Sequence, residues 1–273
     1  MKINLDGINL NYELNGTGPC LVLIHGLTDN LSMWFNQVPE LSKKFQVVTY
    51  DLRGHGQSET PGNGFSIDLL TKDLYKLLKA LNIENACLLG YSLGGRIGLQ
   101  FALEHPDMTT GLVLTNIGLI GPDYQAGEER LKLIAKHRQF MISLFESSDI
   151  EMIANVLAEG ALTPGLKTKN PSIFEKYRDI KLQNNPQPYL ELMQAITQDL
   201  ERLPEIGHLN IPTLIVAGKH DPMMTPDVVE SMQKAFSDSA LKILPTGHAS
   251  AVEAPDHFNQ IVIDFMKRFA AIN

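Results

Sequence analysis

The stretch Ala86-Cys87-Leu88-Leu89-Gly90-Tyr91-Ser92-Leu93-Gly94 decides the fold of this chain of 273 residues. Its apolar half, residues 86–89, has the character of a buried strand, and a helical pattern follows over residues 96–104. A Gly-x-Ser-x-Gly sequence between a strand and a helix predicts a sharp turn, in which a strained serine projects its hydroxyl above a sheet. Gly90 and Gly94 lack Cβ atoms, so the strand and the helix can approach each other closely. We therefore predict that Ser92 is a nucleophile.

Other apolar runs of four or five residues recur along the chain, and turn residues bound each of them. Such runs are typical of buried parallel strands. Helical patterns separate several runs, as over residues 66–81, which predicts an α/β sheet with helices on both faces. A hairpin of residues 2–5 and 8–14 and a short strand over residues 241–244 bring this mostly parallel sheet to eight strands. The apolar runs are residues 21–24, 47–50, 86–89, 111–115 and 213–217.

The alternation of strands and helices breaks between Gly118 and about Gly207. Residues 131–145, 150–157 and 189–200 carry helical periodicities there, and no convincing strand lies between them. We predict that residues 119–206 form a helical cap, inserted into a core domain of residues 1–118 and 207–273. Most methionine and aromatic side chains of the cap are expected to pack the cap onto itself, and a few to face the cleft.

Asp221 is the candidate acid of a catalytic set, because a serine hydroxyl needs a neighbouring base and the base needs an orienting acid. It follows the strand expected over residues 213–217 across a short loop. Active sites of open α/β sheets form at the carboxyl ends of parallel strands, so we predict that Asp221 orients the base. The alternative role, a cap for the next helix, is better served by Thr225, with Pro226 in the first helical position.

His248 is the candidate base, because it lies in a glycine-containing loop after the strand of residues 241–244. Such a loop can reach the neighbouring strand ends. Among the seven other histidines, His220 is the serious rival, but it is adjacent to Asp221, whose carboxylate could hardly orient its ring. His25, at a strand end, is interpreted as a brace for its loop. The remaining histidines fit a glycine-rich turn, a helix end, the cap or the solvated surface.

Two backbone amides are expected to form an oxyanion hole. A tetrahedral intermediate carries a negative charge that needs two or more hydrogen-bond donors. The amide of Leu93, at the start of the helix after Ser92, is one expected donor. The other should come from the loop of residues 25–30, and we assign it to the amide of Leu27.

Composition and charge exclude several classes of protein. The net charge of −8 and the lack of any basic run longer than two residues argue against a nucleic-acid surface. The first residues lack the apolar centre of a signal peptide, and no stretch approaches the ~20 apolar residues of a membrane span. We therefore expect a cytoplasmic protein that binds neither nucleic acid nor a membrane. The sequence leaves its oligomeric state open.

No cofactor or metal is predicted. The histidines lack the spacing of metal ligands, and no Gly-x-Gly-x-x-Gly follows the first parallel strand, as a nucleotide or flavin site would require. Cys20 and Cys87 belong to separate apolar runs without a second cluster of ligands. Both are interpreted as buried thiols rather than as a disulfide or a metal site.

Together, these motifs resemble those of α/β-hydrolase-fold proteins over nearly the full length of the chain. In that family the segment of residues 51–58 is structural, a glycine-rich turn beneath the oxyanion loop, and a helical cap is inserted where one is expected here. The matching motifs are His25-Gly26, Trp34, Asp51-Leu52-Arg53-Gly54-His55-Gly56-Gln57-Ser58, Gly90-Tyr91-Ser92-Leu93-Gly94-Gly95, Gly218-Lys219-His220-Asp221-Pro222 and Gly247-His248.

The resemblance implies a serine hydrolase, since a serine nucleophile indicates acyl transfer rather than the alkyl-enzyme chemistry of the family's aspartate enzymes. The chain is most similar to small carboxylesterases and to enol-lactone hydrolases of the β-ketoadipate type, which implies a small ester or lactone substrate. Hydrolysis of carbon–carbon bonds in ring-cleavage products uses the same triad and is an alternative. A ligand receptor of the same fold, with a triad but without turnover, is an alternative of another class.

Tyr91, Trp34 and Arg96 are predicted to contact the substrate. The segment from Tyr91 to Arg96 resembles the elbow of the menaquinone-pathway synthase that eliminates pyruvate, in which an arginine helps to hold an anionic substrate. Many esterases also carry an arginine there, and Asn116-Ile117-Gly118-Leu119 departs from the Ser-Pro-Gly-Leu of that synthase. Basic residues of the cap could receive a carboxylate, although solvated helix faces explain them as well: Arg130, Lys132, Lys136, His137 and Arg138.

Overall fold

Eight strands form one sheet in the computed structural model, which describes residues 1–61, 64–117, 128–147, 149–186, 188–200, 209–222 and 224–268. Their spatial order is β1-β2-β4-β3-β5-β6-β7-β8. β2 pairs antiparallel with β1 and β4, and all the other neighbours are parallel, as predicted. The strands are β1 (Lys2–Leu5), β2 (Ile8–Asn15), β3 (Cys20–Ile24), β4 (Gln46–Tyr50), β5 (Ala86–Tyr91), β6 (Thr109–Thr115), β7 (Thr213–Gly218) and β8 (Ser239–Leu244).

The predicted hairpin and apolar strands are confirmed. β1 and β2 pair around Asp6 and Gly7, which have φ values of +51° and +92°. The central strands β5 and β7 are buried along their whole length, which explains why they are continuous apolar runs in the sequence. The helix predicted over residues 66–81 also forms, and the Ser66 hydroxyl caps it by accepting a hydrogen bond from the Leu69 amide (3.1 Å).

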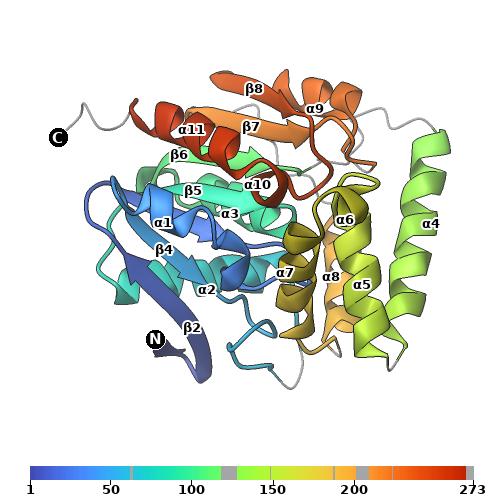
Figure 1. Ribbon diagram of the computed structural model, residues 1–273. Helices are drawn as coiled ribbons and strands as arrows, with labels where there is room; N and C mark the ends of the chain where they lie inside the picture. The colour runs from blue at the N-terminus through green and yellow to red at the C-terminus, as the bar shows by residue number, and fades with distance from the viewer. Residues whose placement is uncertain are drawn as a thin grey trace.

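Alternate side chains of the central strands enter two separate cores, one on each face of the sheet. Val22 and Leu88 face the core that α2, α3 and α9 cover, whereas Leu21 and Leu89 face the core that α1, α10 and α11 cover. Figure 1 looks onto the second face. The helices are α1 (Val38–Leu41), α2 (Ile67–Ala80), α3 (Leu93–Glu104), α9 (Pro226–Gln233), α10 (Ser250–Glu253) and α11 (Pro255–Met266), with two short 3₁₀ helices, η1 (Leu31–Trp34) and η2 (Pro106–Met108).

Between β6 and β7, five helices of the described part of the chain stand together beside the sheet (Figure 1). Three of them confirm the predicted helical segments, whereas α6 and α7 were not predicted. A signal for α7 was present, because Asn170 caps it and Pro171 occupies its first position. The predicted cap boundaries, residues 119 and 206, lie outside the described residues. We call these five the cap helices: α4 (Glu128–Phe145), α5 (Ile150–Ala161), α6 (Leu166–Lys169), α7 (Pro171–Leu182) and α8 (Tyr189–Leu200).

The cap helices pack in two ways. Met141, Phe145 and Tyr189 belong to a small core within the cap. Phe174 and Ile180 of α7 instead join the core on the sheet face that α11 covers. The cap therefore packs onto itself only in part, contrary to the prediction for most of its methionine and aromatic side chains, and α7 anchors it to the sheet.

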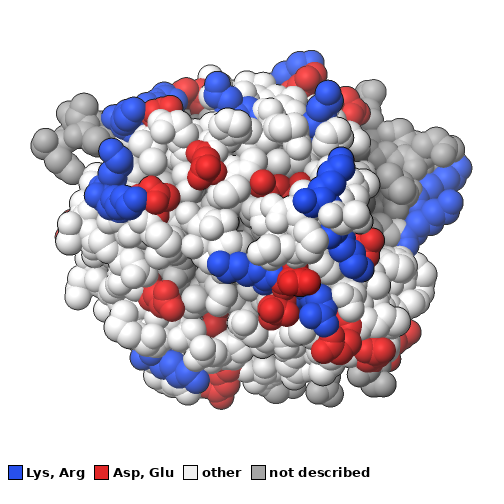
Figure 2. All heavy atoms as spheres, in the orientation of Figure 1, with Lys and Arg blue, Asp and Glu red and all other residues white. Residues whose placement is uncertain are grey.

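The surface carries charges of both signs. On the face in Figure 2, basic and acidic side chains are interspersed, and further basic side chains protrude where Figure 1 places α4. None of the helices in the described ranges combines the length and the apolarity that crossing a membrane requires.

Candidate active site

Ser92 lies in the turn between β5 and α3, and its backbone is strained, with φ at +51° and ψ at −113°. Such values cost about 1–3 kcal/mol and persist only where the surroundings enforce them. The glycines on either side of this turn are explained by backbone atoms that lie close to them. A Cβ at Gly90 would collide with the carbonyl of Gly94, and a Cβ at Gly94 would collide with the carbonyl of Ile24 on β3. The predicted sharp turn is therefore present.

Ser92, His248 and Asp221 meet at the carboxyl ends of β5, β8 and β7. The Ser92 hydroxyl lies 3.1 Å from Nε2 of His248, and Nδ1 of His248 lies 2.6 Å from Oδ2 of Asp221. The Asp221 side chain is completely buried and that of His248 is 20% exposed, so the imidazole is the accessible part of the pair. The rival base, His220, is an exposed residue and takes no part in this arrangement. The geometry is the one that an activated serine requires.

Asp221 is held by more than the imidazole. The side-chain amide of Asn116 donates to Oδ2 of Asp221 (3.1 Å) and to the Gly247 carbonyl (3.3 Å), while the Met224 amide donates to Oδ1 (3.0 Å). Burial alone would raise the pKa of Asp221, but the charge of His248 and these hydrogen bonds outweigh it and hold the pKa below its usual range. No motif points to Asn116; its place directly after the central strand β6 was the available signal.

The oxyanion loop, residues 25–30, follows β3 and carries one of the two predicted donors. Leu93 is the first residue of α3, so its amide has no partner within the helix. Among the hydrogen bonds within the described ranges, none uses the amide of Leu27 or that of Leu93. Both amides are therefore available to a negatively charged oxygen, and the start of α3 adds a partial positive charge.

His25 braces this loop, as predicted. Its Nδ1 donates to the Gly26 carbonyl (2.8 Å), and its Nε2 accepts from the Leu52 amide (2.9 Å), which defines a neutral ring. Burial lowers the pKa of His25 to about 3, and burial likewise lowers that of His55, whose ring lies 5.1 Å from it, to about 3. Neither imidazole therefore carries a charge at neutral pH.

Residues 51–58 form the glycine-rich turn that the family resemblance implies. The Asp51 carboxylate accepts hydrogen bonds from the amide of Leu31 (2.7 Å), just after the oxyanion loop, and from the amide of Gln57 (2.8 Å). Gly56 has φ at +51°, and a Cβ there would collide with the same carboxylate. Through the Asp51 carboxylate, the turn therefore holds the residue that follows the oxyanion loop.

A cavity of about 190 Å³ contains the Ser92 hydroxyl, the His248 ring and the Leu27 side of the oxyanion loop. The sheet side contributes the reactive groups. The cap helices α4, α5 and α8 contribute mostly apolar side chains: Phe140, Met141, Val156, Leu157, Ala161 and Met193. In the described part of the chain, no group of three His, Cys, Asp or Glu side chains gathers as a metal site would require.

The structure corrects two of the three predicted substrate contacts. Tyr91 is part of the described cavity lining, but Trp34 and Arg96 are not. Trp34 is completely buried in the core beneath α11, and Arg96 is buried within α3. The spacing argument for Arg96 fails because Ser92 precedes the helix with non-helical backbone angles, so the two residues do not share a helix face.

Within the described part of the cap, two basic side chains line the cavity. His137 of α4, one of the basic cap residues considered as carboxylate ligands, is exposed on its helix yet lines the cavity; partial burial lowers its pKa, with the charge of His248 adding to the shift. Lys132 and Lys136 are exposed, which fits solvated helix faces, and the Arg130 side chain lies outside the described ones. The second basic residue is Lys181 of α7, which sequence patterns did not reveal.

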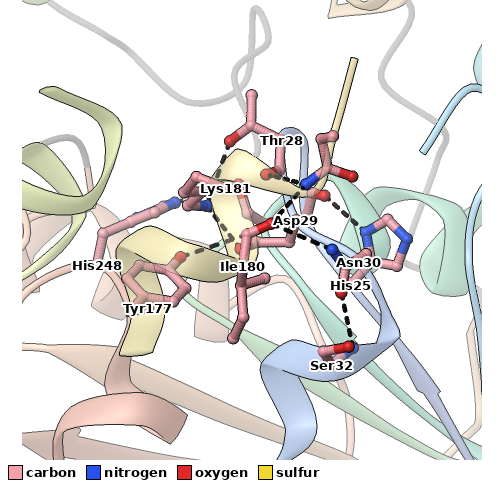
Figure 3. A network of polar contacts seen from close by, with 12 residues as sticks. His25, Thr28, Asp29, Asn30, Ser32, Tyr177, Ile180, Lys181 and His248 are labelled. Carbon is pink, nitrogen blue, oxygen red and sulfur yellow. Dashed lines mark hydrogen bonds and ion pairs between the residues drawn. The ribbon is translucent and has the colours of Figure 1, made fainter. Parts of the chain in front are cut away.

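Lys181 belongs to a buried network that joins α7 to the oxyanion loop (Figure 3). Its Nζ lies 2.6 Å from Oδ1 of Asp29 and 3.2 Å from the hydroxyl of Thr28. The Tyr177 hydroxyl donates to Oδ2 of Asp29 (3.4 Å), and the Asn184 side chain donates to the Thr28 carbonyl (3.0 Å). Burial raises the pKa of Asp29 and lowers that of Lys181, while the attraction between the two charges opposes both shifts.

A second set of contacts joins the cap to the loop that carries His248. The Ala249 amide donates to the carbonyl of Ala161, at the end of α5 (2.9 Å). The Glu253 carboxylate accepts from the amide of Gly247 (2.7 Å) and from that of Thr163 (3.0 Å). The cap is thus bound both to the oxyanion loop and to the loop that carries His248.

Comparisons with known proteins agree with this architecture. The model of the alpha/beta hydrolase fold family matches residues 19–255. The 3-oxoadipate enol-lactonase 2 of Acinetobacter baylyi is 31% identical over 264 residues, which cover 96% of this chain and 94% of that protein. The 2-hydroxy-6-oxo-6-(2'-aminophenyl)hexa-2,4-dienoic acid hydrolase of Metapseudomonas resinovorans is 26% identical over 280 residues, covering 99% of this chain and 91% of that one.

A solved structure, the enol-lactonase from Burkholderia xenovorans LB400, has a TM-score of 0.84 and 28% identity to this chain, covering 98% of it and 100% of that chain. The match extends over the sheet, the cap helices and the strand-end loops together. Because the family model also covers most of the sequence, the chain belongs to the α/β-hydrolase family.

Proposed function

We propose that this protein is a serine hydrolase that cleaves a small carboxylic ester or lactone through an acyl-enzyme intermediate. One observation carries the proposal: Nε2 of His248 lies 3.1 Å from the Ser92 hydroxyl, while Nδ1 lies 2.6 Å from Asp221. With the Nδ1 proton bonded to the carboxylate, Nε2 is the nitrogen that can accept the serine proton. The similarity to two enol-lactonases supports a lactone or ester as the substrate.

Acylation follows from this geometry. His248 removes the proton from the Ser92 hydroxyl as the oxygen attacks the substrate carbonyl. The amides of Leu27 and Leu93 stabilise the negative oxygen of the tetrahedral intermediate, and the buried Asp221 stabilises the imidazolium that has formed. His248 then gives its proton to the departing alkoxide, which leaves an ester between the acyl group and Ser92.

Deacylation reverses these roles. His248 takes a proton from water, the resulting hydroxide attacks the acyl-enzyme, and the same two amides stabilise the second tetrahedral intermediate. Ser92 leaves with the proton from His248, which restores the starting state. For a lactone, the alcohol released by ring opening stays joined to the acyl group, so the cavity must hold both ends until water attacks.

The size of the cavity limits the substrate. A cavity of about 150 Å³ in another protein is large enough to hold benzene. The cavity of about 190 Å³ beside Ser92 therefore suits a short acyl chain or a single ring, and its mostly apolar cap wall favours hydrocarbon over a highly polar chain.

The test is hydrolysis of a panel that runs from p-nitrophenyl acetate to long-chain esters, with lactones and a dicarboxylic half-ester added. Ser92→Ala should lower kcat by about 10⁶-fold, whereas Ser237→Ala, at an exposed serine, should leave it unchanged. An optimum between acetyl and butyryl esters is expected. Equal rates in the wild type and Ser92→Ala would refute the proposal; inertness of both, with a small ligand still binding in calorimetry, would favour the receptor alternative.

A second candidate is hydrolysis of a carbon–carbon bond, which the similarity to the Metapseudomonas hydrolase supports. The same serine could attack a ketone carbonyl, with a stabilised carbanion as the leaving group. A vinylogous 1,5-diketone that is cleaved faster than every ester and lactone of the panel, with Ser92 required, would favour this activity.

A further inference from the structure

Thr28 has a backbone conformation that requires an explanation. Its φ is +68°, in the left-handed region that β-branched residues rarely adopt. It is the third residue of a turn that the Asp29 amide closes onto the Gly26 carbonyl (3.3 Å), a position where a positive φ is usually supplied by glycine or asparagine. Because strain of this kind persists only when the surroundings enforce it, neighbouring groups must hold Thr28 in place.

The groups that hold Thr28 come from one helix of the cap. Lys181 donates to the Thr28 hydroxyl (3.2 Å) and pairs with the next residue, Asp29 (2.6 Å), as Figure 3 shows. Asn184, just beyond the end of α7, donates to the Thr28 carbonyl (3.0 Å). The side chains of Lys181 and Asp29 are 3% and 1% exposed, so water cannot replace these contacts.

We propose that Lys181 and Asp29 are positioning residues for the oxyanion hole, because their ion pair holds Thr28 in its left-handed conformation and so fixes the direction of the adjacent Leu27 amide. The inference rests on the proposed function, since an oxyanion hole acts only in a reaction that passes through a tetrahedral intermediate. The cap then has a catalytic task besides enclosing the substrate: α7 must be docked before the second donor is aligned.

Lys181 also lines the cavity, where it could bind a carboxylate of the substrate instead. The surrounding contacts favour the positioning role. Asp29 already neutralises the ammonium charge, Thr28 accepts a second of its three protons, and the ring of Tyr177 lies 4.4 Å from Nζ. If Lys181 positions the oxyanion donor, its replacement should change kcat, whereas if it binds a substrate carboxylate, its replacement should change KM.

The first experiment compares Lys181→Met with Lys176→Met, an exposed lysine on the same helix. On a neutral ester such as p-nitrophenyl butyrate, Lys181→Met should lower kcat about 10²-fold with little change in KM, which is the cost expected for a misplaced oxyanion donor. The Ki of a trifluoromethyl ketone, which mimics the tetrahedral intermediate, should rise by the same factor by which kcat/KM falls. Lys176→Met should change none of these quantities.

The second experiment removes the strain itself. Glycine adopts a positive φ without steric cost, so Thr28→Gly should reduce the need for Lys181. In the Thr28→Gly background, Lys181→Met should therefore lower kcat by less than about tenfold, against about 10²-fold in the wild-type background. A residue that merely stabilises the fold would give the same factor in both backgrounds.

The outcomes separate this inference from the proposed function. A wild type without turnover that depends on Ser92 would refute the proposed function, and the inference with it. Normal kcat per titrated active site in Lys181→Met, or a loss confined to the KM of carboxylate-bearing substrates, would overturn the inference alone. If Lys181→Met does not fold, Asp29→Asn, which keeps the side-chain volume, carries the same test with the same expected losses.

Discussion

The two walls of the cavity are built differently. On the sheet side, the groups around Ser92 come from loops at strand ends, and polar contacts such as those from Asn116 to Asp221 fix their atoms. On the cap side, α4, α5 and α8 present apolar side chains such as Leu157 and Met193. Directional hydrogen bonds fix a geometry, whereas apolar contacts specify little beyond shape. The sheet side is therefore suited to carry the chemistry and the cap side to select the substrate.

α7 is the exception to this division, because its polar side chains contact the oxyanion loop rather than only enclosing the cavity. Its apolar residues Phe174 and Ile180 pack into the core beneath α11. A cap helix anchored in this way can be part of the reactive wall. The following predictions test how far the division between the two walls extends.

The largest effect is expected for the two histidines near Asp221. His248→Ala should lower kcat by about 10⁵ to 10⁶-fold, because its imidazole contacts Ser92 and is the proposed base. His220→Ala should leave kcat within about twofold, since this exposed residue lies outside the arrangement. Steady-state kinetics on one ester, with melting temperatures to confirm folding, measures both. Full activity in His248→Ala would transfer the role of base to His220.

The pH dependence of stability should report on the buried histidines of the sheet side. His25 and His55 have pKa values lowered by burial to about 3, whereas a histidine in the unfolded chain titrates near 6.5. Below pH 6.5 the unfolded state therefore binds protons that the folded state does not. The stability present above pH 6.5 is lost as the pH falls toward 3. The two residues together should lower the free energy of unfolding by about 3 kcal/mol between pH 6.5 and 5.

Urea unfolding at half-unit intervals of pH measures this loss. His55→Gln should remove about half of the slope of the free energy of unfolding against pH, because one of the two groups no longer titrates. His257→Gln, at an exposed position of α11, is the matched control and should leave the slope unchanged. A slope that is the same in His55→Gln and the wild type would show that the buried ring is not the source.

The smallest effect is expected on the apolar wall. Leu157→Ala enlarges the cavity, so kcat/KM for a p-nitrophenyl octanoate should rise about tenfold relative to the acetate. Ile150→Ala, at an exposed position of the same helix, should leave this ratio unchanged. If Leu157→Ala lowers the turnover of both esters by the same factor, Leu157 contributes to the chemistry rather than to the choice of substrate, and the distinction between the two walls does not hold for α5.

Local patterns predict the strands and the elbow of the sheet side well, and on the cap side they predict α4, α5 and α8 but not α6 and α7. The strand-turn-helix around Ser92 is predictable because its apolar run, its two glycines and its helix are adjacent in the chain. α7 shows the opposite case. Its cap at Asn170, its first-position Pro171 and its apolar residues at helical spacing are ordinary helix signals, but the prolines on both sides of this short helix give the segment the look of a loop. Trp34 fails for another reason, since a sequence cannot distinguish a large side chain that fills a core from one that lines a cavity.

The sequence by itself determined the mostly parallel sheet, the elbow at Ser92 and the three residues that converge there. These features depend on short-range spacing and on the rule that parallel strands end at one edge of a sheet. Only the tertiary structure decided which cap residues face the cavity, and that Lys181 meets Asp29 across 152 residues of chain. Contacts of that range depend on how whole helices dock, and docking is set by the summed shape of many apolar side chains rather than by any local pattern.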